Sequence, residues 1–127
     1  MIRRPLPTYR EKLDVIEVKL AEWVKHKGYR QQSLKMSDVA TALEVYKGDL
    51  SQCVNARMKM SFTAWVNMLR IEDAKSLLLQ HAEMPLSAVS RMLGYSTPAV
   101  FKKNFTLLTG CSPEEWQDSI GSDKAAD

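Results

Sequence analysis

The chain has 127 residues and a formal net charge of +3, with 45% hydrophobic and 26% charged residues. This length suits a single domain with a modest core, which places any function on a surface rather than in a deep cleft. No apolar run approaches the ~20 residues that cross a bilayer, and no signal-peptide hydrophobic region follows the basic start, so we expect no membrane contact from this segment.

The sequence contains no pattern typical of a catalytic, cofactor or metal site. Cys53 and Cys111 are far apart and have no CxxC or Cys/His spacing, which predicts reduced thiols in an intracellular protein. There are no paired carboxylates in a candidate cleft, no Gly-rich phosphate loop and no nucleophile beside a base. We therefore expect a protein that is not an enzyme and that holds no cofactor.

Residues 1–35 are expected to form an amphipathic helix from Thr8 to Lys27 and then a loop, packed on the unit that follows. Gly28 is placed to end this helix. The apolar stripe of the helix should consist of Leu13, Ile16, Val18, Leu20, Trp23 and Val24.

The segment 36–60 predicts two short helices separated by a turn at Glu44–Val45, the second running from Lys47 to Lys59. This second helix should bury Leu50, Val54 and Met58, and should expose Lys47, Ser51, Gln52 and Asn55. A linking helix is expected over 61–81, with Ser61 as N-cap. About 20 residues at 1.5 Å each give it a length of roughly 30 Å.

A second pair of helices and a closing helix are predicted over 84–120, with a frayed tail at 121–127. Pro85 suits the start of the first helix and Gly94 its end. The closing helix should run from Ser112 to about Ser119.

In the second helix of this pair, Phe101, Phe105 and Leu108 recur at i, i+4 and i+7 and should face the core. The start of the helix and its exposed face should consist of Ser96, Thr97, Pro98, Ala99, Lys102, Lys103 and Thr106. Residues 84 to 113 include three basic residues and not one Asp or Glu. Such a purely positive local field favours phosphate.

The two helix pairs are copies of one unit. Ser37, Val39, Ala40 and Leu43 align with Ser87, Val89, Ser90 and Leu93; after a one-residue offset within the second helix, Leu50, Val54, Ser61 and Trp65 align with Phe101, Phe105, Ser112 and Trp116. A small residue midway along the first helix allows the close crossing of a helix-turn-helix, whose second helix enters a DNA major groove. A rigid linking helix of roughly 30 Å is close to the ~34 Å between successive major-groove segments, so one monomer could read both.

These residues resemble the DNA-binding domain of AraC/XylS-type transcription regulators over roughly residues 35 to 118. The shared pattern is F-x-x-W-V-N-x-L-R-I-x-x-A-x-x-L-L from Phe62, then V-S-R-M-L-G-Y-S-T-P-A-V-F-K-K-N-F, then G-C-S-P-E-E-W ending at Trp116. The resemblance implies an all-α domain of about seven helices, with two helix-turn-helix units joined by the linking helix. It also implies promoter regulation, contact with RNA polymerase and a sensory domain elsewhere in the full-length protein. Lys103 stands where the family commonly has arginine, and a lysine lacks the bidentate fork, which predicts weaker base discrimination there. Gln52 occupies a position that arginine often holds, and its amide can pair bidentately with adenine.

Sequence-specific binding of double-stranded DNA for transcription regulation is the function that these patterns favour. Lys102 and Lys103 of the second helix pair can instead form a solvated helix face. In the same way, Ser51, Gln52 and Asn55 of the first pair can form an inert polar surface. Ser96 and Thr97 are helix caps first, although the same helix N-terminus can hold a phosphate. Arg70, on the linking helix near Asp73, is expected to form a structural ion pair rather than a DNA contact.

An alternative function is a helical protein-interaction module that docks on polymerase or a sensor partner without reading bases. The thin basic charge of the first helix pair points that way. We expect a cytoplasmic location in either case, including as the cytoplasmic end of a larger, membrane-anchored regulator.

Overall fold

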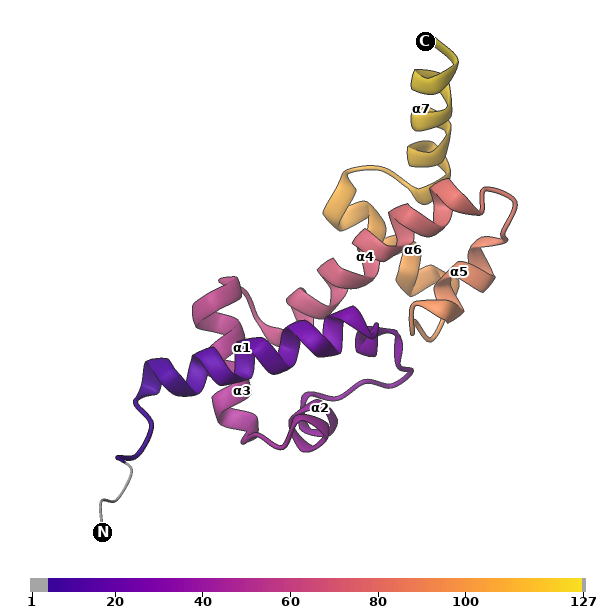
Figure 1. Cartoon of the computed structure of the whole chain (residues 1–127). Coiled ribbons are helices and arrows are strands. Elements are labelled where there is room, and N and C mark those ends of the chain that lie inside the picture. The colour runs from indigo at the N-terminus through magenta and orange to yellow at the C-terminus, as the bar shows by residue number, and fades with distance from the viewer. Residues whose placement is uncertain (1–4, 127) are drawn as a thin grey trace. The chain divides into compact units, whose positions relative to one another are not determined.

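The computed structural model describes residues 5–126, with side chains up to Ile120, and consists of helices joined by short connections (Figure 1). The α-helices are α1 (Tyr9–Lys25), α2 (Met36–Leu43), α3 (Lys47–Cys53), α4 (Phe62–Gln80), α5 (Leu86–Met92), α6 (Pro98–Thr109) and α7 (Pro113–Ala126). A 3₁₀ turn, η1 (Gly28–Arg30), follows α1, and a π-helical turn, η2 (Val54–Met58), extends α3. Residues 5–126 contain no β-strand, which confirms the predicted all-α class. None of these helices combines the length and the apolar character that a membrane span requires.

The chain divides into two compact units. The first comprises residues 1–28 and 34–65, and the second comprises 29–33 and 66–127. The division falls within α4, near its start. The short segment 29–33 belongs to the second unit, although in the sequence it connects two helices of the first.

The core of the first unit is formed by α1, α2 and α3. Leu13, Ile16 and Leu20 recur along one face of α1 and are at most 4% exposed. The prediction that Val18 shares this face is wrong, because its side chain is 68% exposed. At about 100° per residue, Val18 lies about 160° around the helix from Ile16 and Leu20, and therefore faces solvent.

The end of α1 is closed by aromatic packing. The Trp23 ring stacks on Trp65, with ring centroids 5.8 Å apart. The prediction that Gly28 ends the helix is wrong, since α1 ends at Lys25 and Lys27 turns the chain with a left-handed φ of 59°. Gly28 serves close packing instead, because a Cβ at this position would overlap the indole ring of Trp23.

The second helix of the first pair is shorter than predicted. α3 ends at Cys53 and continues as the π turn η2, where the sequence predicts one helix to Lys59. A π-helix closes i→i+5 bonds, which shifts the residues that face inward. Cys53 and Val54 are accordingly fully buried beside Leu50, whereas the predicted core residue Met58 is only partly buried.

The second unit is built around two phenylalanines of α6. Phe101 and Phe105 are fully buried, and Trp116 of α7 packs edge-on against Phe105 with ring centroids 5.8 Å apart. Leu108 was predicted on the same face but is 51% exposed. Trp116 already fills the space beyond Phe105, so the last turn of α6 projects past the core. The other core residues lie on α4, on α5 and in the turn: Ile71, Ala74, Leu77, Leu78, Val89, Leu93 and Tyr95.

Segment 29–33 is fastened to α4 by buried polar contacts within the second unit. The Asp73 carboxylate accepts hydrogen bonds from Nε of Arg30 at 2.6 Å and from the hydroxyl of Tyr29 at 2.9 Å. Arg70 donates to two backbone carbonyl oxygens of the segment, at 2.7 and 3.0 Å. The prediction that Arg70 forms an ion pair is therefore wrong: its side chain has a structural role through backbone oxygens, and Arg30 forms the ion pair with Asp73.

The two helix pairs turn in the same way. Glu44 and Gly94 both have a left-handed backbone, with φ of 57° and 93°. In each pair, the backbone N–H of the next residue donates to the carbonyl of the small residue in the first helix. The Val45 amide donates to Ala40 at 3.0 Å, and the Tyr95 amide donates to Ser90 at 3.1 Å. The predicted repeat is thus a repeat of backbone geometry within each unit.

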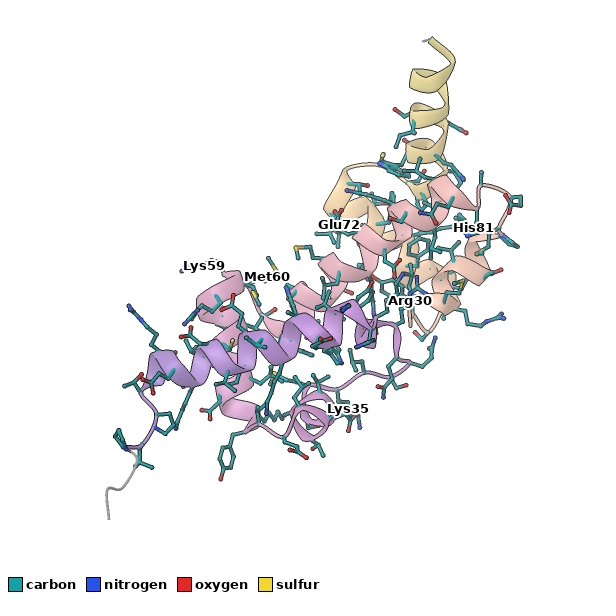
Figure 2. The ribbon with its side chains drawn as sticks, in the orientation of Figure 1. Arg30, Lys35, Lys59, Met60, Glu72 and His81 are labelled. Atoms are coloured by element: carbon teal, nitrogen blue, oxygen red, sulfur yellow. The ribbon has the colours of Figure 1, made fainter. Side chains whose placement is uncertain are left out.

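The two copies also end alike. Lys59, which follows η2 (Figure 2), and Gly110, which follows α6, have left-handed φ values of 62° and 86°. Ser61 and Ser112 then accept hydrogen bonds from the amide three residues further on, at 3.2 and 3.1 Å. Both serines therefore cap the helix that follows, as their alignment predicts.

The closing helix is longer than predicted. α7 runs to Ala126, whereas the sequence predicts its end near Ser119 and a tail from Gly121 onward. A single glycine inside a helix costs only about 1 kcal/mol relative to alanine, so Gly121 does not end the helix. Asp127, the last residue of the predicted tail, lies outside the described residues.

The turn before α6 generates a stability prediction. A Cβ at Gly94 would lie 2.6 Å from the Arg30 carbonyl oxygen, whereas a Cβ at Gly110 would meet nothing within 4 Å. Gly110→Ala should lower the free energy of unfolding by about 1 kcal/mol, through its left-handed backbone alone. Gly94→Ala should cost about 3 kcal/mol or more, because overpacking adds to the same strain. Urea unfolding of both variants checks this, and equal losses would contradict the close approach at Gly94.

Two buried tyrosines of the second unit predict alkaline lability. Burial and the hydrogen bond to Asp73 raise the pKa of Tyr29 from 10.0 to about 12, and burial raises the pKa of Tyr95 to about 12. The unfolded chain loses these protons near pH 10 and the folded chain only near pH 12, so stability should fall across that window. Between pH 10 and pH 12, the Tyr29→Phe variant should lose roughly 2 to 3 kcal/mol less of its unfolding free energy than the wild type, measured as unfolding free energy against pH. Tyr46→Phe, at an 81% exposed position, is the control and should leave the profile unchanged.

Candidate nucleic-acid interface

The start of α6 is defined by two residues. The Thr97 hydroxyl accepts a hydrogen bond from the Val100 amide at 3.2 Å, and Pro98 is the first helical residue. Both features confirm the predicted helix start. The residue at the corresponding cap position of α3 is Tyr46, so the one-residue offset of the repeat lies in the turn, where Ser96 is additional, and not within the second helix.

The face of α6 opposite its phenylalanines is open to solvent. Val100 and Leu107, 41% and 72% exposed, also lie on this surface, where the sequence does not predict them. Sequence patterns miss them because apolar residues of an amphipathic helix are normally assigned to the core. All residues predicted for the start and the exposed face are exposed: Ser96, Thr97, Pro98, Ala99, Lys102, Lys103 and Thr106.

The corresponding surface of the first unit is polar and nearly uncharged. Lys47 and Gln52 are exposed on α3, and Ser51 is half-buried. Asn55 is exposed but lies in η2 rather than in α3, with its amide nitrogen 3.4 Å from the Ser51 hydroxyl. Asp49 in the first turn of α3 offsets the charge of Lys47.

Lys102 is paired, which corrects the prediction of a purely positive field. Its Nζ lies 3.1 Å from a carboxylate oxygen of Glu114, the first residue after the acid-free stretch. The backbone N–H of Glu114 and the Lys102 ammonium lower the pKa of that carboxyl, so the charge of Glu114 persists below its usual range. Lys103, one residue further along α6, is exposed and has no ion-pair partner among the described residues.

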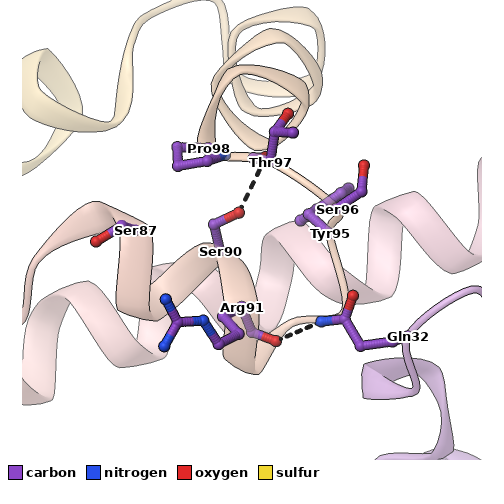
Figure 3. A pocket seen from close by; sticks show the side chains of 8 residues that line it. All are labelled: Gln32, Ser87, Ser90, Arg91, Tyr95, Ser96, Thr97 and Pro98. Carbon is purple, nitrogen blue, oxygen red and sulfur yellow. Dashed lines mark hydrogen bonds between the residues drawn. The ribbon is translucent and has the colours of Figure 1, made fainter.

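A polar hollow lies beside the turn between α5 and α6 (Figure 3). The Ser90 hydroxyl donates across it to the Thr97 carbonyl at 3.1 Å, and the Gln32 amide donates to the Arg91 carbonyl at 2.9 Å. No acidic residue lines the hollow. Its lining residues are Gln32, Ser87, Ser90, Arg91, Tyr95, Ser96, Thr97 and Pro98.

The cysteines and acidic residues do not assemble a site in the described part of the chain. Cys53 and Cys111 are free thiols, and burial raises the pKa of the Cys53 thiol, which keeps it protonated at neutral pH. No three His, Cys, Asp or Glu side chains among the described residues lie together as metal ligands would.

Sequence comparison matches residues 39–119 to a family described as a helix-turn-helix domain. The lactose operon transcription activator of Staphylococcus xylosus is 28% identical over 87 residues, which are 68% of this chain and 31% of that protein. The arabinose operon regulatory protein of Escherichia coli (strain K12) is 34% identical over 68 residues, which are 54% of this chain and 23% of that protein. The chain thus spans about a third or less of the length of these relatives.

Structure comparison finds the same fold in solved domains of two regulators. The C-terminal domain of AraT, a response regulator from Geobacillus stearothermophilus, has a TM-score of 0.73 at 27% identity, over 83% of this chain and 84% of that chain. The DNA-binding domain of the transcription factor AdpA, in complex with a target DNA, has a TM-score of 0.74 at 13% identity, over 88% of this chain and 97% of that chain.

The Lys102–Glu114 pair generates a prediction for polyanion binding. Glu114→Gln should strengthen binding to mixed-sequence duplex DNA severalfold at low salt, because it frees the Lys102 ammonium. Glu115→Gln is the matched control: it removes the same charge from the first turn of α7, but from a carboxylate hydrogen-bonded to Ser112. Fluorescence anisotropy at several salt concentrations measures both variants. Equal effects would show that only net charge matters and would contradict the specific role of the pair.

Proposed function

Because the chain belongs to the AraC/XylS-type helix-turn-helix regulators, we propose that α3 and α6 enter successive major-groove segments of one DNA duplex. Sequence-specific DNA binding in transcription regulation is the function of this domain, which is not an enzyme. The repeat is the observation that supports the two-helix proposal. Both helix pairs have a left-handed residue at the same position of the turn, Glu44 or Gly94, and the same backbone hydrogen bond across it. In a helix-turn-helix, that turn presents the second helix to the major groove.

Base reading by α6 is proposed to centre on Lys103. Its ammonium is exposed and unpaired among the described residues, and a lysine can donate to the O6 and N7 acceptors of guanine. The exposed Ala99 side chain suits contact with a thymine methyl group, and Thr106 can donate or accept through its hydroxyl. Lys102 and the helix start at Ser96, Thr97 and Pro98 are proposed to face the DNA backbone.

Base reading by α3 is proposed to depend on amides rather than cations. Gln52 is exposed and can pair bidentately with adenine. Asn55 and the half-buried Ser51 are proposed as further hydrogen-bonding groups beside Gln52. Lys47 at the helix start is proposed to contact phosphate. The first unit should therefore contribute base preference with little salt-dependent affinity.

The partners beyond DNA are proposed from the relatives. The curated relatives are about three to four times as long as the matched region, which supports a sensory domain in the full-length protein. Contact with RNA polymerase and a cytoplasmic location, free or at the cytoplasmic end of an anchored regulator, are proposed on the same family grounds. The balanced charge of Lys47 and Asp49 favours a second candidate role for the first unit, docking on a protein partner without base readout.

Selection from random duplexes tests the proposed function. The full chain should enrich a motif with two conserved blocks about 10 base pairs apart, one for each recognition helix. A single block would restrict DNA reading to one unit and support protein docking by the other. No enriched motif, together with retained binding to a protein partner, would overturn base readout altogether.

Lys103→Ala should weaken binding to the selected duplex by about 1 to 3 kcal/mol and relax preference at the base pairs that α6 reads. Lys102→Ala should weaken all sequences alike and flatten the salt dependence by at most about one unit, because Glu114 already offsets part of the Lys102 charge. Titrations of both variants against the selected duplex and scrambled duplexes measure this difference. Wild-type affinity of the double alanine variant for the selected duplex would contradict the assignment of α6.

A further inference from the structure

Most cations of the second unit are already paired. Among the lysines and arginines of residues 29–33 and 66–120, only Arg91 and Lys103 have an exposed side chain without a hydrogen-bond or ion-pair partner. The other cations are engaged: Arg30 with Asp73, Arg70 with backbone carbonyls, Lys75 with Glu72 and Lys102 with Glu114. Lys103 lies on the reading face of α6, which leaves Arg91 without an assigned role.

Arg91 lies on α5 beside the polar hollow (Figure 3). Ser87 precedes it by one helical turn, and the i, i+4 spacing puts the Ser87 hydroxyl and the Arg91 guanidinium on the same face of the helix. Gln32 from segment 29–33 donates its amide to the Arg91 carbonyl at 2.9 Å. The backbone that carries the guanidinium is therefore held at the end of α5, while the guanidinium itself points away from the Gln32 amide (Figure 3).

The Arg91 guanidinium and the Ser87 hydroxyl suit one tetrahedral anion. A guanidinium offers two parallel N–H groups to a phosphate, and the Ser87 hydroxyl on the same face of α5 adds a neutral donor. The Ser90 hydroxyl is already bonded to the Thr97 carbonyl, so it is not counted among these donors. No carboxylate lines the hollow to compete for the guanidinium.

We infer that Arg91, with Ser87, binds a backbone phosphate of the DNA that α6 reads, an inference that rests on the proposed function. In a helix-turn-helix the first helix crosses the DNA backbone while the second lies in the groove, and α5 is that first helix. Arg91 is then a positioning residue, which sets the register of α6 without reading a base. In the sequence, Arg91 is one of the three basic residues of segment 84–113, and no local pattern distinguishes it from a solvated arginine.

Salt titrations of duplex binding test this inference. Arg91→Ala should weaken binding about tenfold and reduce the slope of log affinity against log salt by about one, for the selected duplex and for scrambled duplexes alike. The motif that the variant selects should be unchanged. Lys75→Ala, which removes a cation of the same unit from α4, is the matched control and should leave the slope unchanged.

Neutral methylphosphonate substitutions, one at a time along the selected duplex, locate the contact. The wild-type chain should lose affinity at one phosphate where the Arg91→Ala variant loses none, because the contact is already absent. Inorganic phosphate at matched ionic strength should not displace the duplex, which separates a backbone phosphate from a free-phosphate site. Displacement by inorganic phosphate would overturn the assignment to DNA.

The outcomes separate this inference from the function on which it rests. A wild-type chain that selects a motif, with an Arg91→Ala variant that keeps the wild-type slope and methylphosphonate profile, would overturn the inference and leave the function standing. A wild-type chain that binds no duplex would overturn both.

Discussion

The second helix pair depends on the missing side chain at Gly94. Its left-handed turn lets the carbonyl of Arg30 and the guanidinium of Arg70 approach to distances that no Cβ would tolerate. Segment 29–33 can therefore pack directly on the turn, where the Arg30–Asp73 ion pair fastens it to α4. The orientation of α5 and α6 within this unit thus depends on a segment that precedes them in the chain by about sixty residues.

Pairing of charges, rather than net charge, shapes the candidate interface. The acid-free stretch ends one residue before Glu114, and the Glu114 carboxylate forms an ion pair with Lys102. Arg91 and Lys103 remain unpaired in the described part of the second unit, one beside the turn and one on the reading face. The proposed division follows from their positions, with a phosphate contact that sets register and a base contact that sets preference.

The two copies have diverged in chemistry while keeping one backbone. Gln52 occupies the position in α3 that Lys103 has in α6, and the first copy widens into a π turn where the second stays α-helical. If both helices read DNA as proposed, the second unit supplies most of the electrostatic attraction. The first then adds amide-based preference, whose strength depends little on salt.

The sequence by itself determined the features that depend on neighbours along the chain. The all-α class, the caps at Ser61 and Thr97, the turn at Gly94 and the repeat were all predicted, because each follows from helical periodicity or from local backbone preference. Helix periodicity failed at Val18 and Leu108, where apolar residues face solvent. Only the tertiary structure decided which polar groups meet: Lys102 with Glu114, Arg30 with Asp73 and Gln32 with Arg91. The last two pairs join residues 43 and 59 positions apart, and a long flexible side chain has no sequence pattern that names its partner at such a distance.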